Sequence, residues 1–295
     1  MMQFELPLPK AYRSKEVLIF HGRDKQQLAE RVEGDLLIKG IVLEGVICTL
    51  QLQIQKNFAV CTVQADGKMP ALNQLTSVAQ RLLSLQWEVE SFEKRFLLDP
   101  WLGKLISEQR GLRIAQTATV FEALSWAIIA QQINLAFAVQ LRSAFIQLAN
   151  MRHSSGFFAY PDAGAVAQLS IQTLKMNRFS EAKAQAIVRV AQLVENGDLP
   201  LEEWLVTKPD VHLMTKTLLA IKGIGPWTVN YTLLRGYGFN DCELQGDSAV
   251  REALRRMLHS TEKITIIQAE QILSRYAPYR SLAIAHLWAS LARTE

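Results

Sequence analysis

The sequence predicts an α+β protein in which a small antiparallel-sheet domain, residues 1–90, precedes an all-helical domain, residues 91–295. Two observations indicate this division. Polar and apolar residues alternate strictly in TLQLQIQ, which is the period of a strand with one buried face. After residue 71 the pattern changes to helical spacing, and strand-like stretches hardly return. Strands followed by many helices are typical of the α+β class.

The first domain contains three stretches rich in β-branched or aromatic residues. We expect strands at EVLIF (16–20), LLIKGIVLEG (36–45) and ICTLQLQIQKNFAVCTVQ (47–64). Residues 71–85, ALNQLTSVAQRLLSL, have helical period and predict a helix that covers the sheet.

The second domain reads as helices joined by short connections, which indicates a helical bundle. Ser180 and Asp247 each precede a helical stretch and are expected to cap it with their side chains. The expected helices cover residues 120–131, 135–149, 180–196, 210–220, 226–236, 248–258, 266–275 and a last stretch from about 280.

Composition excludes several classes of protein. The 32 Lys and Arg against 28 Asp and Glu give a net charge of +4, which permits nucleic-acid binding without requiring it. Cys48, Cys61 and Cys242 are too few for a four-thiolate zinc or iron–sulfur site, and their odd number argues against a disulfide framework. Glu5 and two prolines interrupt the N-terminus where a signal peptide would be apolar, and no apolar run is long enough for a membrane span. We expect a soluble, cytoplasmic protein.

The stretch LLAIKGIGPWTVNY predicts a helix, a tight hairpin and a second helix. Gly223 and Gly225 can take positive φ and allow a close approach of another backbone, and Pro226 suits a first helical turn. The amides at the start of the second helix would be free to bind a phosphate, which would position DNA without reading its bases. A plain turn between two helices would show the same pattern.

From about residue 100 onward the chain resembles the helix–hairpin–helix DNA glycosylases. The hairpin LLAIKGIGPWTVNY is followed by the glycine-containing loop GYGFNDCELQG and then by Asp247, as in that superfamily. The N-terminal sheet domain makes it most similar to the DNA-3-methyladenine glycosylase II branch. Two departures are the absence of proline from the loop and the presence of Gly246 before Asp247. The resemblance implies an active-site cleft between two halves of the helical domain.

The resemblance implies that Asp247 is the catalytic carboxylate. Cleavage of a glycosidic bond usually requires two carboxyl groups, one of which protonates the leaving group. An alkylated purine is already cationic, so it leaves as a neutral base without being protonated by an acid. A single carboxylate at a helix N-terminus can then oppose the positive charge that builds on the deoxyribose. Capping the helix is compatible with this role.

The resemblance also implies that Trp227, Tyr231 and Trp288 line the pocket for the damaged base. Aromatic faces attract electron-deficient, cationic bases by ~0.5–2 kcal/mol each. An aromatic pair four residues apart is equally typical of a helical core, and this alternative stays open for Tyr231.

Further residues are expected to bind DNA. The resemblance puts the wedge that replaces the flipped base at Gln132, where that branch has an apolar side chain, although Gln131 and Gln132 also suit a polar corner between helices. Lys183 and Arg189 could contact phosphates or simply be solvated. A structural Na⁺ or K⁺ on the main-chain carbonyls of Leu219, Ile221 and Ile224 is implied by the resemblance. The expected DNA-binding residues are Lys222, Gly223, Gly225, Thr228, Gln131 and Gln132.

Together these features predict a monofunctional DNA N-glycosylase that flips out alkylated purines of the 3-methyladenine and 7-methylguanine type and leaves an abasic site in duplex DNA. Bifunctional relatives carry a nucleophilic lysine where this chain has Trp227. We expect no catalytic cofactor, no iron–sulfur cluster and a monomer. The alternatives are a glycosylase for oxidised or deaminated bases, and a non-catalytic damaged-DNA-binding protein.

Overall fold

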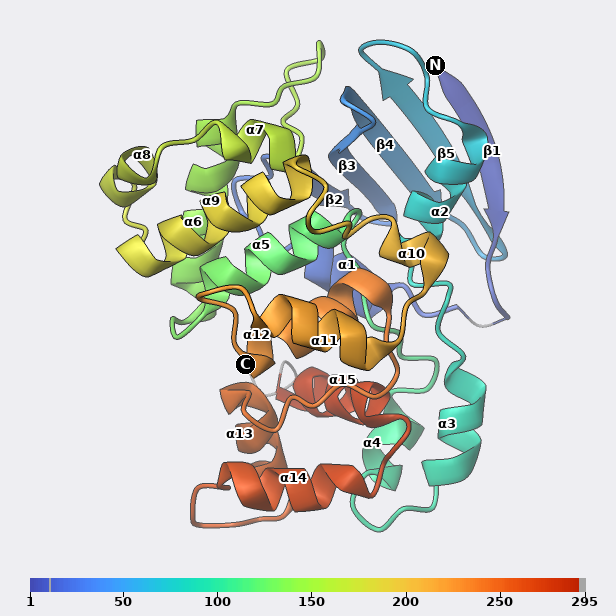
Figure 1. The fold of residues 1–295 in the computed structure, drawn as a ribbon. Helices are drawn as coiled ribbons and strands as arrows, with labels where there is room; N and C mark the ends of the chain where they lie inside the picture. Colours follow the sequence, from blue (N-terminus) through green and yellow to red (C-terminus); the bar gives the residue numbers. More distant parts are fainter. Residues whose placement is uncertain (11, 292–295) are drawn as a thin grey trace.

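The chain begins with an antiparallel sheet whose strands lie in the order β1-β5-β4-β3-β2 (Figure 1). The computed structural model describes residues 1–10 and 12–291. Apolar side chains on one face of the sheet pack against α2 (Leu72–Leu82). The strands are β1 (Met2–Pro7), β2 (Glu30–Glu33), β3 (Leu36–Leu43), β4 (Val46–Ile54) and β5 (Phe58–Ala65).

The expected fold class is confirmed, but one predicted strand was wrong. Residues 16–20 lie in helix α1 (Lys15–His21), where the buried side chains are Val17, Phe20 and His21. That spacing of three and four is helical, and the β-branched composition concealed it. The predicted 47–64 strand is two strands, β4 and β5, joined by a turn, and the edge strands β1 and β2 were not predicted.

Every helix predicted after residue 90 is present, and the short helices α3, α4, α7, α8 and α10 are additional. The expected helix at 226–236 changes at its end into a π-helical turn, η1. Residues 292–295 of the predicted helical domain lie outside the described residues. The elements are α3 (Val89–Phe96), α4 (Gly103–Glu108), α5 (Val120–Ala130), α6 (Leu135–Ala149), α7 (Ala163–Ala167), α8 (Ile171–Met176), α9 (Glu181–Glu195), α10 (Trp204–Thr207), α11 (Val211–Leu219), α12 (Pro226–Thr232), η1 (Leu233–Tyr237), α13 (Ser248–Met257), α14 (Ile266–Ser274) and α15 (Arg280–Leu291).

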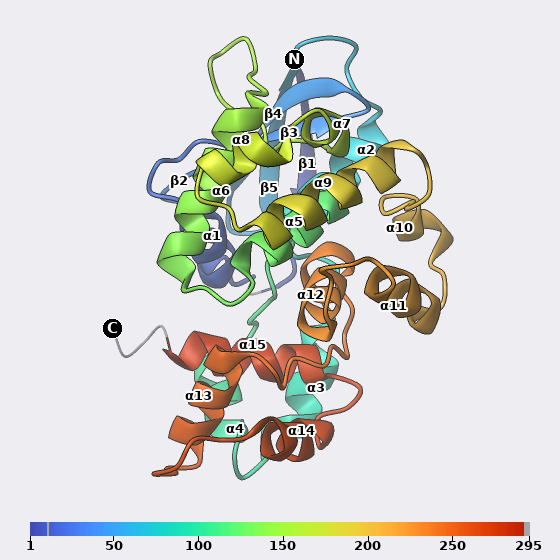
Figure 2. The same cartoon turned by 60° about the vertical axis from the view of Figure 1, so that its left-hand side comes forward.

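Two groups of helices flank α11 and α12. In Figures 1 and 2 the helices α5, α6 and α9 lie beside the sheet, whereas α3 and α4 lie with α13, α14 and α15 at the other end. The second group therefore joins segments that are far apart in sequence. The domain division at residue 90 stays a prediction. None of the helices in the described part of the chain is both long and apolar enough to cross a bilayer.

A buried cluster of charges connects the sheet to the helices. The ammonium of Lys39 on β3 lies 2.7 Å from Glu30 Oε1 on β2, and it also binds Glu122 on α5. The guanidinium of Arg142 on α6 contacts the same two carboxylates at 3.0 and 3.2 Å. Each of these charges lies beside an opposite charge. Removing one member of such a cluster would leave an unpaired buried charge, at a cost of ~3–5 kcal/mol in stability. These contacts fix how α5 and α6 lie against the sheet.

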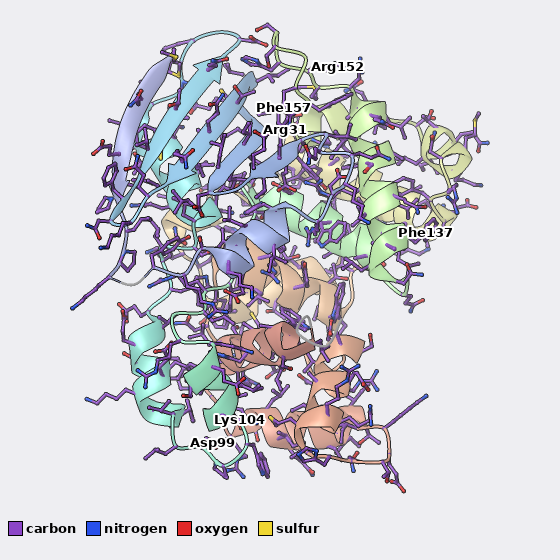
Figure 3. All side chains as sticks on the ribbon, turned by 180° about the vertical axis from the view of Figure 1, so that it is seen from behind. Arg31, Asp99, Lys104, Phe137, Arg152 and Phe157 are labelled. Atoms are coloured by element: carbon purple, nitrogen blue, oxygen red, sulfur yellow. The ribbon has the colours of Figure 1, made fainter. Side chains whose placement is uncertain are left out.

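The segment that follows α6 returns to the sheet. The amide of Tyr160 donates to the carbonyl of Gly40 on β3 at 3.1 Å. Figure 3 shows Phe157 and Arg31 side by side, and the guanidinium carbon of Arg31 is 5.6 Å from the centre of the Phe157 ring. The sheet is thus held by side chains and by main-chain bonds outside its own strands.

We expect His286 to make stability depend on pH. Burial against Phe92 lowers its pKa from 6.5 to about 3, and the charge of Arg13 adds to this effect. The unfolded chain takes up a proton near pH 6.5 and the folded chain does not, so stability falls as pH drops through this window. We expect the free energy of unfolding, measured by urea denaturation, to fall more steeply in wild type than in His286→Gln between about pH 6 and about pH 4. The difference should reach up to ~1.4 kcal/mol per pH unit. Equal slopes for the two proteins would contradict this assignment.

Candidate active site

The predicted hairpin lies between α11 and α12. Gly223 has φ +97°, and a Cβ built there would lie 2.9 Å from the Cβ of Ala186 on α9. The expected positive φ and close approach are therefore found at this glycine. Gly225 differs, because its φ is −106° and no atom lies within 4 Å of its missing Cβ. The space where a Gly225 side chain would lie is therefore empty. Pro226 follows as the first residue of α12.

The two adjacent glutamines at the end of α5 have different surroundings. The amide of Gln131 donates to Gly223 O at 2.9 Å and to Thr228 Oγ1 at 2.8 Å. Gln131 therefore holds the hairpin through the Gly223 carbonyl and through Thr228, which is buried. Gln132 is exposed and has a left-handed backbone with φ +53°. The side chain of Gln131 is thus engaged by the hairpin, whereas that of Gln132 is exposed.

Asp247 accepts hydrogen bonds from three different helices. It caps α13, and its Oδ1 accepts from the amide of Val250 at 3.0 Å. The indole of Trp288 on α15 donates to the same oxygen at 3.3 Å, and the indole of Trp227 on α12 donates to Oδ2 at 3.0 Å. The predicted cap is confirmed, and both predicted pocket tryptophans donate hydrogen bonds to the carboxylate.

The distribution of these donors leaves one oxygen of Asp247 with spare capacity. A carboxylate has about four acceptor positions, two on each oxygen. Oδ1 uses both with Val250 and Trp288, whereas Oδ2 uses one with Trp227. Oδ2 can therefore accept one further hydrogen bond or face a positive charge.

A cleft of about 810 Å³ opens beside this carboxylate. It brings the hairpin, the two glutamines and the start of α13 to one place. Asn134 and Ser248, which the sequence analysis did not select, also line it. The lining residues are Ala130, Gln131, Gln132, Ile133, Asn134, Gly223, Gly225, Pro226, Trp227, Thr228, Gly246, Asp247 and Ser248.

The three predicted aromatic residues do not line one surface. Tyr231 is buried behind Trp227, with ring centres 5.1 Å apart, and its hydroxyl accepts from the indole of Trp126 at 3.0 Å. Trp288 borders a second cavity beside α1, while its indole N–H reaches Asp247. Among the three, Trp227 is the one that lines the cleft itself.

Arg235 is the main residue of this region that sequence reasoning missed. Its guanidinium carbon lies 5.3 Å from the Trp288 ring and 5.8 Å from the Tyr231 ring. Burial raises the pKa of Tyr231, but the charges of Arg235 and Arg23 more than offset it, so the net pKa is below its usual value. The spacing of 227, 231 and 235 would have placed all three side chains on one helical face.

The lysines and the arginine that the sequence suggested as phosphate contacts differ in burial. Lys183 was expected at the surface, but it is buried, its ammonium donates to Ile129 O at 2.7 Å, and burial lowers its pKa. Arg189 and Lys222 are exposed. Within the described ranges no three His, Cys, Asp or Glu residues are grouped to hold a metal.

Comparison with known proteins gives relatives along nearly the whole chain, although no family model matches it. DNA-3-methyladenine glycosylase of Bacillus subtilis is 24% identical over 290 residues, 96% of this chain and 95% of that protein. DNA-3-methyladenine glycosylase 2 of Escherichia coli is 28% identical over 225 residues, 75% of this chain and 73% of that protein. The solved 3-methyladenine DNA glycosylase of Archaeoglobus fulgidus has a TM-score of 0.82 at 21% identity and covers 97% of each chain.

The two hairpin glycines should respond differently to alanine. Gly223→Ala forces a positive φ on a side chain that also meets Ala186, so we expect a loss of about 1–3 kcal/mol in the free energy of unfolding. Gly225→Ala should change stability by less than ~1 kcal/mol, because its backbone and surroundings accept a methyl group. Urea denaturation of both variants checks this. Equal losses for the two would show that the approach of Ala186 is not what selects glycine at 223.

Proposed function

We propose that this chain, a homologue of the DNA-3-methyladenine glycosylases with the fold of the helix–hairpin–helix glycosylases, is a monofunctional DNA N-glycosylase that excises alkylated purines. The observation that carries the proposal is the carboxylate of Asp247, fixed at the edge of the cleft with one acceptor position of Oδ2 unused. The same cleft is bordered by the hairpin, so DNA held there would place a sugar near that oxygen.

The hairpin supplies the means to hold the DNA backbone. The first N–H groups of α12 have no carbonyl of the preceding helical turn to donate to. The empty space beside Gly225 lets a phosphate oxygen approach these N–H groups. Lys222 is exposed on the same hairpin and adds positive charge. Such contacts hold the duplex without selecting its sequence, which suits an enzyme that must find damage anywhere.

The damaged nucleotide must leave the duplex before it can react, because its glycosidic bond is inaccessible in the base stack. We propose that Gln132, exposed at the edge of the cleft, enters the space that the base vacates. Its amide can bond the unpaired partner base, which an apolar side chain cannot do. Gln131 instead holds the hairpin in position through Gly223 and Thr228.

Bond cleavage then needs a negative charge rather than an acid. The C1′–N bond breaks with its electron pair going to the cationic base, which leaves neutral. The positive charge that develops on the sugar faces Oδ2 of Asp247, and preorganised charges of this kind stabilise a transition state strongly. Water adds to C1′ and releases one proton, either to Oδ2 or to solvent. The two indole donors keep the carboxylate in one orientation throughout.

The reaction stops at the abasic site, because the described residues that line the cleft include no lysine to attack C1′. Trp227 occupies the position of the nucleophilic lysine of bifunctional relatives, and Lys222 is exposed on the hairpin outside the cleft lining. No cofactor enters these steps. We place the enzyme in the cytoplasm. We also propose a monomer, since one chain supplies the cleft, Asp247 and both indole donors.

A monovalent cation at the hairpin stays part of the proposal. The carbonyls of Leu219, Ile221 and Ile224 would hold it. The carbonyl of Ile221 already accepts the amide of Ile224 at 3.0 Å, but a carbonyl oxygen has a second lone pair that fits a cation. Its positive charge would assist phosphate binding, and no chemical step depends on it.

Replacing Asp247 should abolish catalysis without unfolding the protein. Asn is a good helix cap, but Asp247→Asn removes the charge and presents an amide N–H₂ to an indole donor, so we expect base release to fall by about 10²-fold or more. The measurement is release of free 3-methyladenine and 7-methylguanine from methylated duplex DNA. Glu252→Gln, the same charge change farther along α13, is the matched control and should release bases at the wild-type rate.

Binding of the Asp247→Asn variant to an abasic duplex completes this test. Removing a negative charge beside the phosphates should leave this affinity unchanged or raise it. Full base release by Asp247→Asn would contradict the role of this carboxylate. Failure of wild type to release either base, with tight binding to abasic DNA, would favour a non-catalytic damaged-DNA-binding protein.

The reaction products should also distinguish the mechanism. We expect the DNA strand to stay intact until alkali cleaves it at the abasic site, and we expect borohydride to trap no covalent complex. Denaturing gels before and after alkali measure both. A borohydride-trapped complex that disappears in Lys222→Gln would instead identify a lysine nucleophile and overturn the monofunctional assignment.

A further inference from the structure

Lys183 is a buried cation that the proposed reaction does not use. It is the third residue of α9, and its amide donates to Oγ of Ser180, the residue that caps this helix, at 3.3 Å. Its ammonium donates to the carbonyl of Ile129 on α5 at 2.7 Å. No carboxylate of the described residues forms an ion pair with it, and burial lowers its pKa. A buried charge without a counter-ion is costly, so its partner must be sought elsewhere.

The partner of this cation is the C-terminal end of α5, beside which α9 lies (Figure 2). The last carbonyls of an α-helix have no amide of a following turn to accept, and they carry partial negative charge. The backbone leaves the helix at Gln131, where ψ is 127°, so the amide four residues after Ile129 is out of reach. The ammonium of Lys183 supplies the missing donor and a positive charge at this end of the helix.

A negative charge holds the opposite end of α5. Oε1 of Glu202 accepts hydrogen bonds from the amides of Val120 at 2.7 Å and Phe121 at 3.0 Å, the first two residues of the helix. An anion at the N-terminus and a cation at the C-terminus both complement the helix dipole. Side chains from two other segments therefore fix α5 at its two ends.

The end of α5 that Lys183 holds carries the proposed wedge. Ile129 precedes Gln132 by three residues, and Gln132 is exposed with a left-handed φ of +53°. A residue other than glycine keeps this conformation only where the surrounding structure fixes it. One turn after Lys183 on α9, Ala186 makes the close approach to Gly223 of the hairpin. The same face of α9 thus supports both the hairpin and the turn that presents Gln132.

We propose that Lys183 is a positioning residue for base flipping, which fixes the turn at Gln132 and so holds this side chain ready to enter the duplex. The inference rests on the proposed glycosylase function and deepens it. Lys183 does not line the cleft, so it acts through α5. A methionine of similar length would fill the space without a buried charge, so packing alone does not account for a lysine here.

The test is a double-mutant cycle between Lys183→Met and Gln132→Ala. The measured quantity is the single-turnover rate of 7-methylguanine release from a duplex in which this base is paired with cytosine. Lys183→Met should lower the rate by about 10-fold, because a displaced wedge enters the duplex less often. Gln132→Ala should lower it at least as much. Combined with Gln132→Ala, Lys183→Met should cause no further loss, because no wedge remains to be positioned.

Glu202→Gln is the matched control for the stability of α5. It removes one charge from the other end of the same helix, away from Gln132. Both Lys183→Met and Glu202→Gln should lower the midpoint of urea denaturation. Whatever factor Glu202→Gln imposes on the rate should be the same with and without Gln132→Ala. Coupling to Gln132 is thus expected of Lys183 and not of Glu202.

A second readout separates flipping from bond cleavage. A base that leaves the stack unstacks its neighbour, which raises the fluorescence of 2-aminopurine placed beside the 7-methylguanine. Lys183→Met should reduce this increase at saturating protein. Asp247→Asn, which acts on the bond and not on the turn, should keep the increase seen with wild type.

The proposal is overturned if Lys183→Met keeps the wild-type rate, or if it lowers the rate by the same factor with and without Gln132→Ala. A wild-type rate for Gln132→Ala, or equal coupling of Glu202→Gln to it, would overturn the proposal as well and leave the glycosylase function intact. Absence of base release by wild type would overturn the proposed function instead, and the fluorescence increase would then decide the role of Lys183.

Lys183→Gln takes the place of Lys183→Met if the latter fails to fold. Its side chain lacks the charge and is too short to reach the Ile129 carbonyl, so the same loss of rate is expected. A wild-type rate for Lys183→Gln, or a loss that persists in full with Gln132→Ala, would overturn the proposal.

Discussion

The hydrogen bonds of the Asp247 carboxylate determine the geometry of the whole site. They connect α12, α13 and α15 through a single side chain. Because an indole N–H lies on the edge of its ring, both tryptophans point an edge at Asp247 and turn their faces elsewhere. The Trp227 ring packs at a tilt against Tyr231, and the Trp288 ring lies 5.3 Å from the guanidinium carbon of Arg235. Capping a helix and the proposed stabilisation of a sugar cation are thus compatible in one fixed carboxylate.

In the proposed mechanism, the hairpin connects DNA binding to the same carboxylate. Trp227 is the second residue of α12, so the helix start that offers amides to a phosphate also carries a donor to Asp247. The hairpin is in turn held by Gln131 and by the close approach of Ala186 to Gly223. A phosphate bound at the hairpin therefore has a set distance from Oδ2, which is what a site without a flexible nucleophile requires.

Local patterns predicted the parts of the fold that depend on local interactions. The alternation in β4, the cap at Asp247 and the positive φ at Gly223 each have a local physical cause. Residues 16–20 were assigned wrongly because β-branched composition outweighed a short helical spacing. The burial of Lys183 and the positions of Arg235 and Phe20 depend on contacts between distant segments, which a single sequence does not contain.

The central claim is that Asp247 acts by its charge on the sugar. The most direct measurement compares the affinity of wild type and Asp247→Asn for two duplexes, one with a neutral tetrahydrofuran abasic site and one with a protonated pyrrolidine in its place. A cationic mimic of the transition state should bind wild type at least ~10²-fold more tightly than the neutral analogue, and Asp247→Asn should lose that preference. Equal binding of the two duplexes by wild type, or a preference that survives in Asp247→Asn, would contradict the account.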